Sequence, residues 1–151
     1  MYTPGNIIYF TPFYFSDEFS PKRKYFIILE VETGNNNILA SLPTRSDHVP
    51  SSIAKRHGCI NKAEINFNCY YFKNDRIITK SVWGFPKETY AYGEQLQLLP
   101  IEDLKSKYKI ENVDYKIMGK LEDCEFKAII ACMRDSRTVK RKYRRLLGAK
   151  I

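Results

Sequence analysis

The sequence contains none of the short motifs that identify common classes of nucleotide-binding or hydrolytic enzyme. It lacks the GxxxxGK[ST] phosphate loop, the GxGxxG dinucleotide turn, the HExxH zinc motif and the GxSxG nucleophile motif. No stretch approaches the roughly 18 consecutive apolar residues of a membrane-spanning helix. Histidine occurs only twice, and the four cysteines show no CxxC spacing, so no metal site or other cofactor is expected.

The few cysteines and histidines are expected to play passive roles. Cys124 and Cys132 fall on one row of a predicted helix, where cysteine is typically a small buried hydrophobic side chain. His48 and His57 stand in a loop rich in Pro and Ser, and we expect both to be solvated. The opening residues lack the positively charged segment of a signal peptide, so we expect a cytoplasmic protein with reduced thiols.

Positive charge is concentrated at the C-terminal end. The last eighteen residues hold eight of the 25 Lys and Arg and only one of the 17 Asp and Glu. They therefore account for +7 of the net charge of +8. We predict one domain over residues 1–137, followed by a basic helical extension at 138–151.

Short strands separated by turn residues dominate the first hundred positions. Segments with strand-like composition are 6–15, 25–31, 38–42, 65–72, 77–82, 89–92 and 95–99. Pro12 suggests an edge strand or a bulge in the first of these. The segment 25–31 (YFIILEV) is apolar on both faces, and Gly34 with Asn35–Asn37 forms a turn, so 25–42 is predicted to be an antiparallel hairpin.

Two helices are predicted between the strands and the basic extension. The first, at about 100–108, has Pro at its first turn and acidic residues near its N-terminus. The second, 122–134, carries apolar residues at helical spacing. Five to seven short antiparallel strands followed by C-terminal helices predict a mainly β, α+β fold, built as a small barrel closed by helices. A β-sandwich would need seven clear strands.

Cations and one hydroxyl flank the predicted hairpin. Arg23 and Lys24 precede its first strand, with Lys22 beside them, and Thr44 and Arg45 follow its second. These residues lie at the same end of an antiparallel hairpin, and guanidinium groups with a hydroxyl suit a phosphate. The alternative is an ordinary group of loop charges at a strand end.

Four segments occur in an order typical of one protein family. They are 4–10 (PGNIIYF), 22–29 (KRKYFIIL), 38–44 (ILASLPT) and 119–126 (GKLEDCEF). In this order they resemble the MazF/PemK family of toxins, over about 1–50 and 95–134. The aromatic-rich middle and residues 138–151 fall outside the resemblance.

The resemblance implies an SH3-like, PemK-type barrel that forms a homodimer. It further implies a metal-independent endoribonuclease that cleaves single-stranded RNA by attack of the 2′-OH. Such an enzyme is the toxin component of a toxin-antitoxin system and is held by a cognate antitoxin. In that family, an Arg before the second strand and a Thr after the third act on the scissile phosphate. Thr44 matches the family Thr. By contrast, Lys24 replaces the family Arg, and Tyr25 replaces the Pro that follows it. Asn6 replaces an Asp near the start of the family sequence.

The predicted catalytic residues are therefore Arg23, Lys24 and Thr44, and three alternatives stay open. Arg23 has taken the role of the family Arg, Lys24 serves as a weaker cation, or catalysis has been lost. A non-catalytic RNA- or protein-binding module on the same barrel is the main alternative function, and a DNA-directed regulator is a weaker one.

Further RNA contacts are predicted from cations and aromatic rings. The predicted RNA-binding residues are Lys22, Arg45, Lys140, Arg141 and Arg144. The three in the tail are equally consistent with a solvated helix face or with a docking surface for an acidic partner. A set of aromatic residues is expected mainly in the core and at its rim, with base stacking as the alternative; it comprises Tyr70, Tyr71, Trp83, Phe85 and Tyr92.

Overall fold

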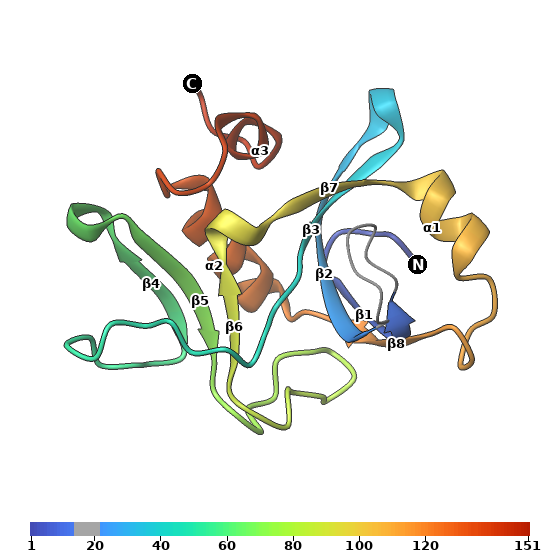
Figure 1. Ribbon diagram of the computed structural model, residues 1–151, viewed down its shortest axis with the longest axis horizontal. Helices are drawn as coiled ribbons and strands as arrows, with labels where there is room; N and C mark the ends of the chain where they lie inside the picture. The colour runs from blue at the N-terminus through green and yellow to red at the C-terminus, as the bar shows by residue number, and fades with distance from the viewer. Residues whose placement is uncertain (14–21) are drawn as a thin grey trace.

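The computed structural model, which describes residues 1–13 and 22–151, contains two antiparallel sheets with α-helices packed around them (Figure 1). The five-stranded sheet has the order β7-β3-β2-β1-β8, with β1 Asn6–Phe13, β2 Lys22–Glu32, β3 Asn37–Ser41, β7 Gln97–Pro100 and β8 Tyr115–Lys120. The three-stranded sheet has the order β4-β5-β6, with β4 Gly58–Lys62, β5 Phe67–Phe72 and β6 Thr89–Tyr92. The α-helices are α1 Ile101–Lys107, α2 Asp123–Arg134 and α3 Arg141–Leu146.

The predicted fold class is confirmed at the level of a mainly β, α+β protein with C-terminal helices. The described residues contain eight strands rather than five to seven. These strands form two separate sheets, not a closed barrel. The two sheets are joined by an isolated antiparallel bridge between Thr44 and Tyr90, just beyond the end of β3.

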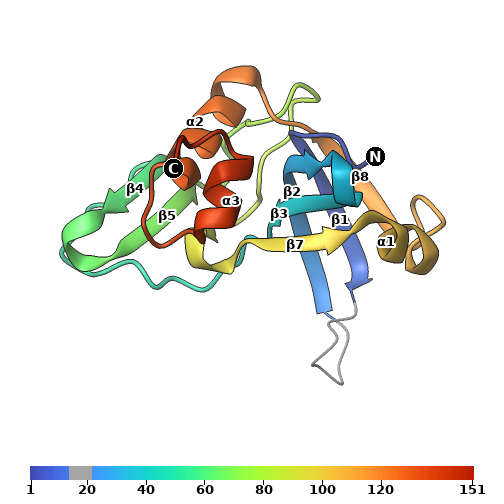
Figure 2. The same ribbon diagram turned by 90° about the horizontal axis from the view of Figure 1, so that it is seen from above.

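Strand β2 is buried on both faces, as its composition indicates. Ile27 and Leu29 point into a core shared with β5 and α2, whereas Phe26 and Ile28 point into a second core covered by α1. All four side chains are fully buried. Figure 2 shows α1 and the three-stranded sheet on opposite sides of the five-stranded sheet.

The β2–β3 hairpin is confirmed, and its register fixes which residues meet at its open end. Asn36 adopts the left-handed conformation at the turn (φ 52°), which Asn tolerates well. Ile27 pairs with Ser41. Three residues farther along an antiparallel register, Lys24 comes level with Thr44.

The segment 77–82 is not a strand, although its composition favours one. Ile77 is 52% exposed and Val82 is 73% exposed, with Val82 in the left-handed region at φ 63°. The carbonyl of Trp83 accepts hydrogen bonds from the N–H groups of Ile78 and Thr79, which closes a tight loop. The segment pairs with another part of the chain only through an isolated antiparallel bridge between Thr79 and Leu121, just beyond β8, so its β-propensity produces no continuous strand.

The opposite error occurs at β4 and β8, which sequence patterns missed. Both contain Gly and Lys, which strands disfavour, yet each pairs with a neighbouring strand, β5 and β1 respectively. Because β1 pairs with β2 on one side and β8 on the other, it is not an edge strand. The bulge alternative is confirmed by a register shift between Phe10 and Phe13, and the end of the predicted 6–15 strand lies outside the described residues.

The C-terminal segment 138–151 packs against the body of the domain. Val139 and Leu147 are buried in the same core as Ile129 of α2. Tyr143 and Leu146 pack against that core from α3. The apolar side of the basic segment is therefore integral to the fold.

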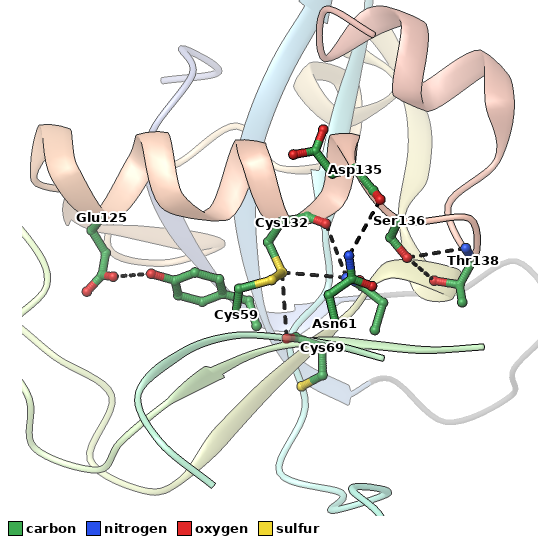
Figure 3. Close-up of a disulfide and its surroundings, with 10 residues drawn as sticks. Cys59, Asn61, Cys69, Glu125, Cys132, Asp135, Ser136 and Thr138 are labelled. Atoms are coloured by element: carbon green, nitrogen blue, oxygen red, sulfur yellow. Dashed lines mark hydrogen bonds between the residues drawn. A yellow bond between two sulfur atoms is a disulfide. The ribbon is translucent and has the colours of Figure 1, made fainter. Parts of the chain in front are cut away.

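A disulfide joins Cys59 of β4 to Cys132 of α2 (Figure 3), contrary to the expectation of reduced thiols. Helix α2 packs over β4 and β5, which brings the two Cα atoms within 5.6 Å. The two residues are 73 positions apart, so their spacing could not reveal the pairing. Cys132 is buried as expected, but Cys124 is exposed and Cys69 is the buried free thiol.

Replacing Cys59 by Ser is expected to lower the free energy of unfolding by about 3–4 kcal/mol, because the bond closes a long loop in the unfolded chain. Urea denaturation of oxidised protein measures the change. The matched control is Cys124→Ser, which removes an exposed free thiol. Equal stability of the wild type and Cys59→Ser without reductant would contradict the prediction.

Candidate functional site

The cations that flank the hairpin converge on one depression, as its register requires. This cationic cleft has a volume of about 420 Å³. Its lining residues are Tyr9, Lys22, Arg23, Lys24, Tyr25, Pro43, Thr44, Arg45 and Thr89. The structure therefore brings together five of the eight predicted site residues from two segments of the chain.

Thr44 is held in the cleft by its own backbone. Its N–H donates to Tyr90 O at 2.9 Å, and Tyr90 N–H donates to Thr44 O at 2.7 Å. The Thr44 hydroxyl accepts a hydrogen bond from Ser46 N–H at 3.2 Å and can still donate its own hydrogen. A bridge between the sheets thus places this hydroxyl at the open end of the hairpin.

The loop after Thr44 is anchored to the three-stranded sheet. Tyr92 OH donates to Ser46 O at 2.5 Å. Lys55 Nζ lies 2.8 Å from Asp47 Oδ2 and donates to Tyr90 OH at 3.0 Å. These contacts limit how far the loop carrying Arg45 can move away from β6.

Aromatic rings form one wall of the cleft. Tyr25 lies 4.5 Å from Tyr9 and 5.1 Å from Phe85 between ring centroids, and Trp83 lies 5.6 Å away. Burial raises the pKa of the Tyr25 phenol, Tyr9 raises it further, and the Arg45 guanidinium acts in the opposite direction. The phenol is therefore neutral at physiological pH and lies within electrostatic reach of Arg45.

The cleft supplies cations and hydroxyls but no ordinary proton acceptor. In the part of the chain that the structure describes, none of the side chains lining the cleft is a carboxylate or a histidine. That same part contains no cluster of three or more His, Cys, Asp or Glu side chains suited to a metal ion. The chemistry that the cleft favours is binding of an anion and stabilisation of negative charge.

The basic tail lies away from this cleft. In Figure 1, α3 and the turn of the β2–β3 hairpin both lie at the top of the view. The charge of Lys142 on α3 is near enough to help lower the pKa of Glu32 beside that turn, after the larger effect of hydrogen bonds from Asn35 and Asn37. Along β2, Glu32 is roughly 33 Å from Lys22 at the usual rise per residue. Lys140, Arg141 and Arg144 are therefore not brought together with the predicted cleft residues.

Two of the tail cations have contacts within their own region. Arg144 Nε donates to Arg134 O at 2.8 Å. Lys140 Nζ lies 5.5 Å from the centre of the Tyr143 ring. These contacts tie the tail to itself and to the end of α2.

The aromatic set lies mainly in the core, as expected. Tyr70, Tyr71, Phe85 and Tyr92 are buried, and Trp83 is half-buried against Tyr25. Tyr71 OH donates to Glu88 at 2.7 Å, so even its polar end has a partner in the fold.

Sequence patterns missed a buried polar cluster formed by His57, Tyr70 and Glu125. Glu125 accepts hydrogen bonds from His57 Nε2 at 2.7 Å and from Tyr70 OH, and the exposed fractions of the His57 and Glu125 side chains are 7% and 12%. His57 Nδ1 accepts from Lys73 N–H at 3.1 Å. The expectation that His57 is solvated is wrong, because α2 covers its loop, whereas His48 is exposed as expected.

This cluster resembles a catalytic pair but is engaged in holding the fold together. Both ring nitrogens of His57 have partners, so neither can accept a substrate proton without breaking a bond. Burial raises the pKa of Glu125, but the hydrogen bonds from His57 and Tyr70 lower it below its usual value overall. No sequence spacing could reveal the cluster, since His57 and Glu125 are 68 residues apart.

Replacing Glu125 by Gln is expected to lower the free energy of unfolding at pH 7 by roughly 1–3 kcal/mol, because a charged acceptor is lost. A carboxyl whose pKa is lowered in the folded state stabilises the fold above its ordinary pKa and loses that effect as the pH falls through the folded value. Denaturation between pH 7 and pH 3 should therefore show a shallower acid dependence for the variant. The control is Glu111→Gln, which removes the same charge from an exposed position. Equal dependence of the unfolding free energy on pH in Glu125→Gln and the wild type would count against the prediction.

Within the described residues, no helix combines the length and apolar character needed to cross a membrane. Comparison of the chain with protein-family models, with curated proteins and with solved structures found no match.

Proposed function

We propose that the cationic cleft binds a phosphate of single-stranded RNA and that the protein is a metal-independent endoribonuclease. The observation that carries the proposal is the convergence of Arg23, Lys24, Thr44 and Arg45 around one open depression. Phosphate is the anion that best matches guanidinium, ammonium and hydroxyl donors placed together. The aromatic wall formed by Tyr25 offers a surface against which a neighbouring base can stack.

In the proposed reaction, the ribose 2′-oxygen attacks the adjacent phosphorus. The new bond joins the 2′-oxygen to phosphorus, and the bond from phosphorus to the 5′-oxygen breaks. Negative charge accumulates on the phosphoryl oxygens, where Arg23 or Lys24 stabilises it and Thr44 donates a hydrogen bond. The 2′-OH proton passes to solvent and the departing 5′-oxygen takes one up, which leaves a 2′,3′-cyclic phosphate and a 5′-hydroxyl.

The second candidate function is binding of RNA, or of a protein, without cleavage. It is favoured by the lining of the cleft, in which the described residues include no carboxylate or histidine to accept a proton. A Lys at the position of the family Arg also weakens bidentate contact with phosphate. Under this alternative the same cations bind the backbone and no bond is broken.

The wider role that we propose follows from the same resemblance. The chain acts as a cytoplasmic toxin, forms a homodimer, and is held inactive by a cognate antitoxin. The exposed cations of α3, among them Arg141, provide a docking surface for an acidic antitoxin segment.

Incubation of the purified protein with single-stranded RNA in EDTA is expected to yield discrete fragments ending in 2′,3′-cyclic phosphate. Mass spectrometry of the fragment ends identifies the product. Intact RNA of varied sequence, in the presence of folded protein that binds it, would favour the binding module.

Separate Arg23→Ala, Lys24→Ala and Thr44→Ala variants assign the roles within the cleft. Removal of the main charge-stabilising group is expected to reduce the cleavage rate about 100- to 1,000-fold. Lys105→Ala, which removes an exposed cation from α1, is the matched control and should cleave at the wild-type rate. Normal cleavage by all three cleft variants would place the active site elsewhere.

A further inference from the structure

Two more depressions continue from the cationic cleft toward the three-stranded sheet. The first, of about 450 Å³, shares Lys22 and Lys24 with the cleft and is also lined by Leu42 and by residues 94–97. The second, of about 230 Å³, is called here the aromatic pocket and is lined by His48, Phe67, Asn68, Tyr92, Glu94 and Thr138 among others. Glu94 lines both, so the three depressions form a row with shared borders.

The aromatic pocket is built around the ring of Tyr92. The centroid of the His48 ring lies 5.4 Å from it, and that of Phe67 lies 6.2 Å from it at a steep angle of 71°. The Tyr92 hydroxyl is occupied, since it donates to Ser46 O and accepts from His48 N–H at 2.7 Å. His48 is exposed and Phe67 half-buried, so their rings are accessible to a planar ligand.

The polar border of this pocket presents one carboxylate, and a second oxygen acceptor is buried behind it. Glu94 is an exposed carboxylate at its edge. The amide oxygen of Asn68 is buried without a hydrogen-bond partner among the described residues, while its amide nitrogen donates to Cys132 O. Gly93 makes this packing possible, because a Cβ there would lie 2.3 Å from Asn68 Oδ1.

We propose that the aromatic pocket binds one nucleobase of a single strand whose phosphate lies in the cationic cleft, and that it selects guanine over uracil. The inference rests on the proposed function and adds a specificity site to it. A nucleic acid strand carries anionic phosphates along its backbone and planar bases beside it, and the row of depressions leads from Lys and Arg side chains at one end to aromatic rings at the other.

The neighbouring cations decide against a different ligand for the same pocket. Aromatic rings beside a carboxylate also suit a methylated ammonium group. Lys22 and Lys24 line the adjoining depression, and they repel a cationic peptide while attracting a polyanion. A nucleobase fits both the pocket and its surroundings.

Glu94 accounts for the choice of base. Guanine presents two adjacent N–H donors on its pairing edge, which match the two oxygens of a carboxylate. Uracil presents a single N–H between two carbonyl oxygens, which the carboxylate repels. A paired contact of this kind discriminates between bases by about tenfold or more.

The test uses 2′-O-methyl oligonucleotides, which cannot be cleaved by 2′-OH attack and so report binding alone. One guanine is moved through each position of an otherwise all-uracil strand, and dissociation constants are measured by fluorescence anisotropy. We expect one position at which guanine improves affinity about tenfold.

Glu94→Gln should abolish that preference, and His48→Ala should weaken binding to the preferred strand about tenfold through lost stacking. Both positions are exposed, so the fold should be retained, and Glu64→Gln, at another exposed position, is the control.

The outcomes separate this inference from the proposed function. Equal affinity for every strand, with binding still lost in Arg23→Ala, overturns the base pocket and leaves the cleft proposal standing. If Arg23→Ala and Lys24→Ala also bind normally, both proposals fail. Tight binding of a trimethyllysine peptide by the wild type, but not by His48→Ala, overturns the base pocket in favour of a peptide site.

Discussion

The burial of β2 on both faces is the constraint on which the rest of the structure depends. Phe26 and Ile28 enter one core while Ile27 and Leu29 enter the other, and all are completely buried. A slip of one residue would exchange the two sets and place Lys24 where Tyr25 now lies, so the register is strongly specified. The arrangement of cations at the open end of the hairpin is a direct result of that register.

The bridge between Thr44 and Tyr90 fixes the position of the three-stranded sheet relative to the open end of the hairpin. It comes immediately after β3, where the chain leaves the five-stranded sheet. Its two backbone hydrogen bonds make the chain turn toward β6. The cleft therefore lies where the two sheets meet, and its walls come from segments distant in the sequence.

Local patterns predicted the parts of the fold that depend on local chemistry. Local patterns identified β2 from its apolar run on both faces, the hairpin turn from its Asn residues, and α2 from the spacing of its apolar residues. The placement of Arg23 and Thr44 in one cleft followed from hairpin geometry alone. Features that depend on distant contacts were not predictable. Cys59 and His57 each find a partner on α2, and β8 is a strand only because β1 lies beside it. The segment 77–82 shows the converse, since its β-branched residues form a loop that makes only an isolated bridge, from Thr79 to Leu121.

The placement of α3 near the turn end of β2, away from the cleft, has a consequence for the distribution of charge. The molecule has two positive regions about a strand length apart, the cationic cleft at one end of β2 and α3 near the other. A short polyanion contacts only one of these regions. A long polyanion contacts both, and its second contact costs less entropy because the first contact already holds it nearby. Affinity for polyanions should therefore depend on their length as well as on their charge.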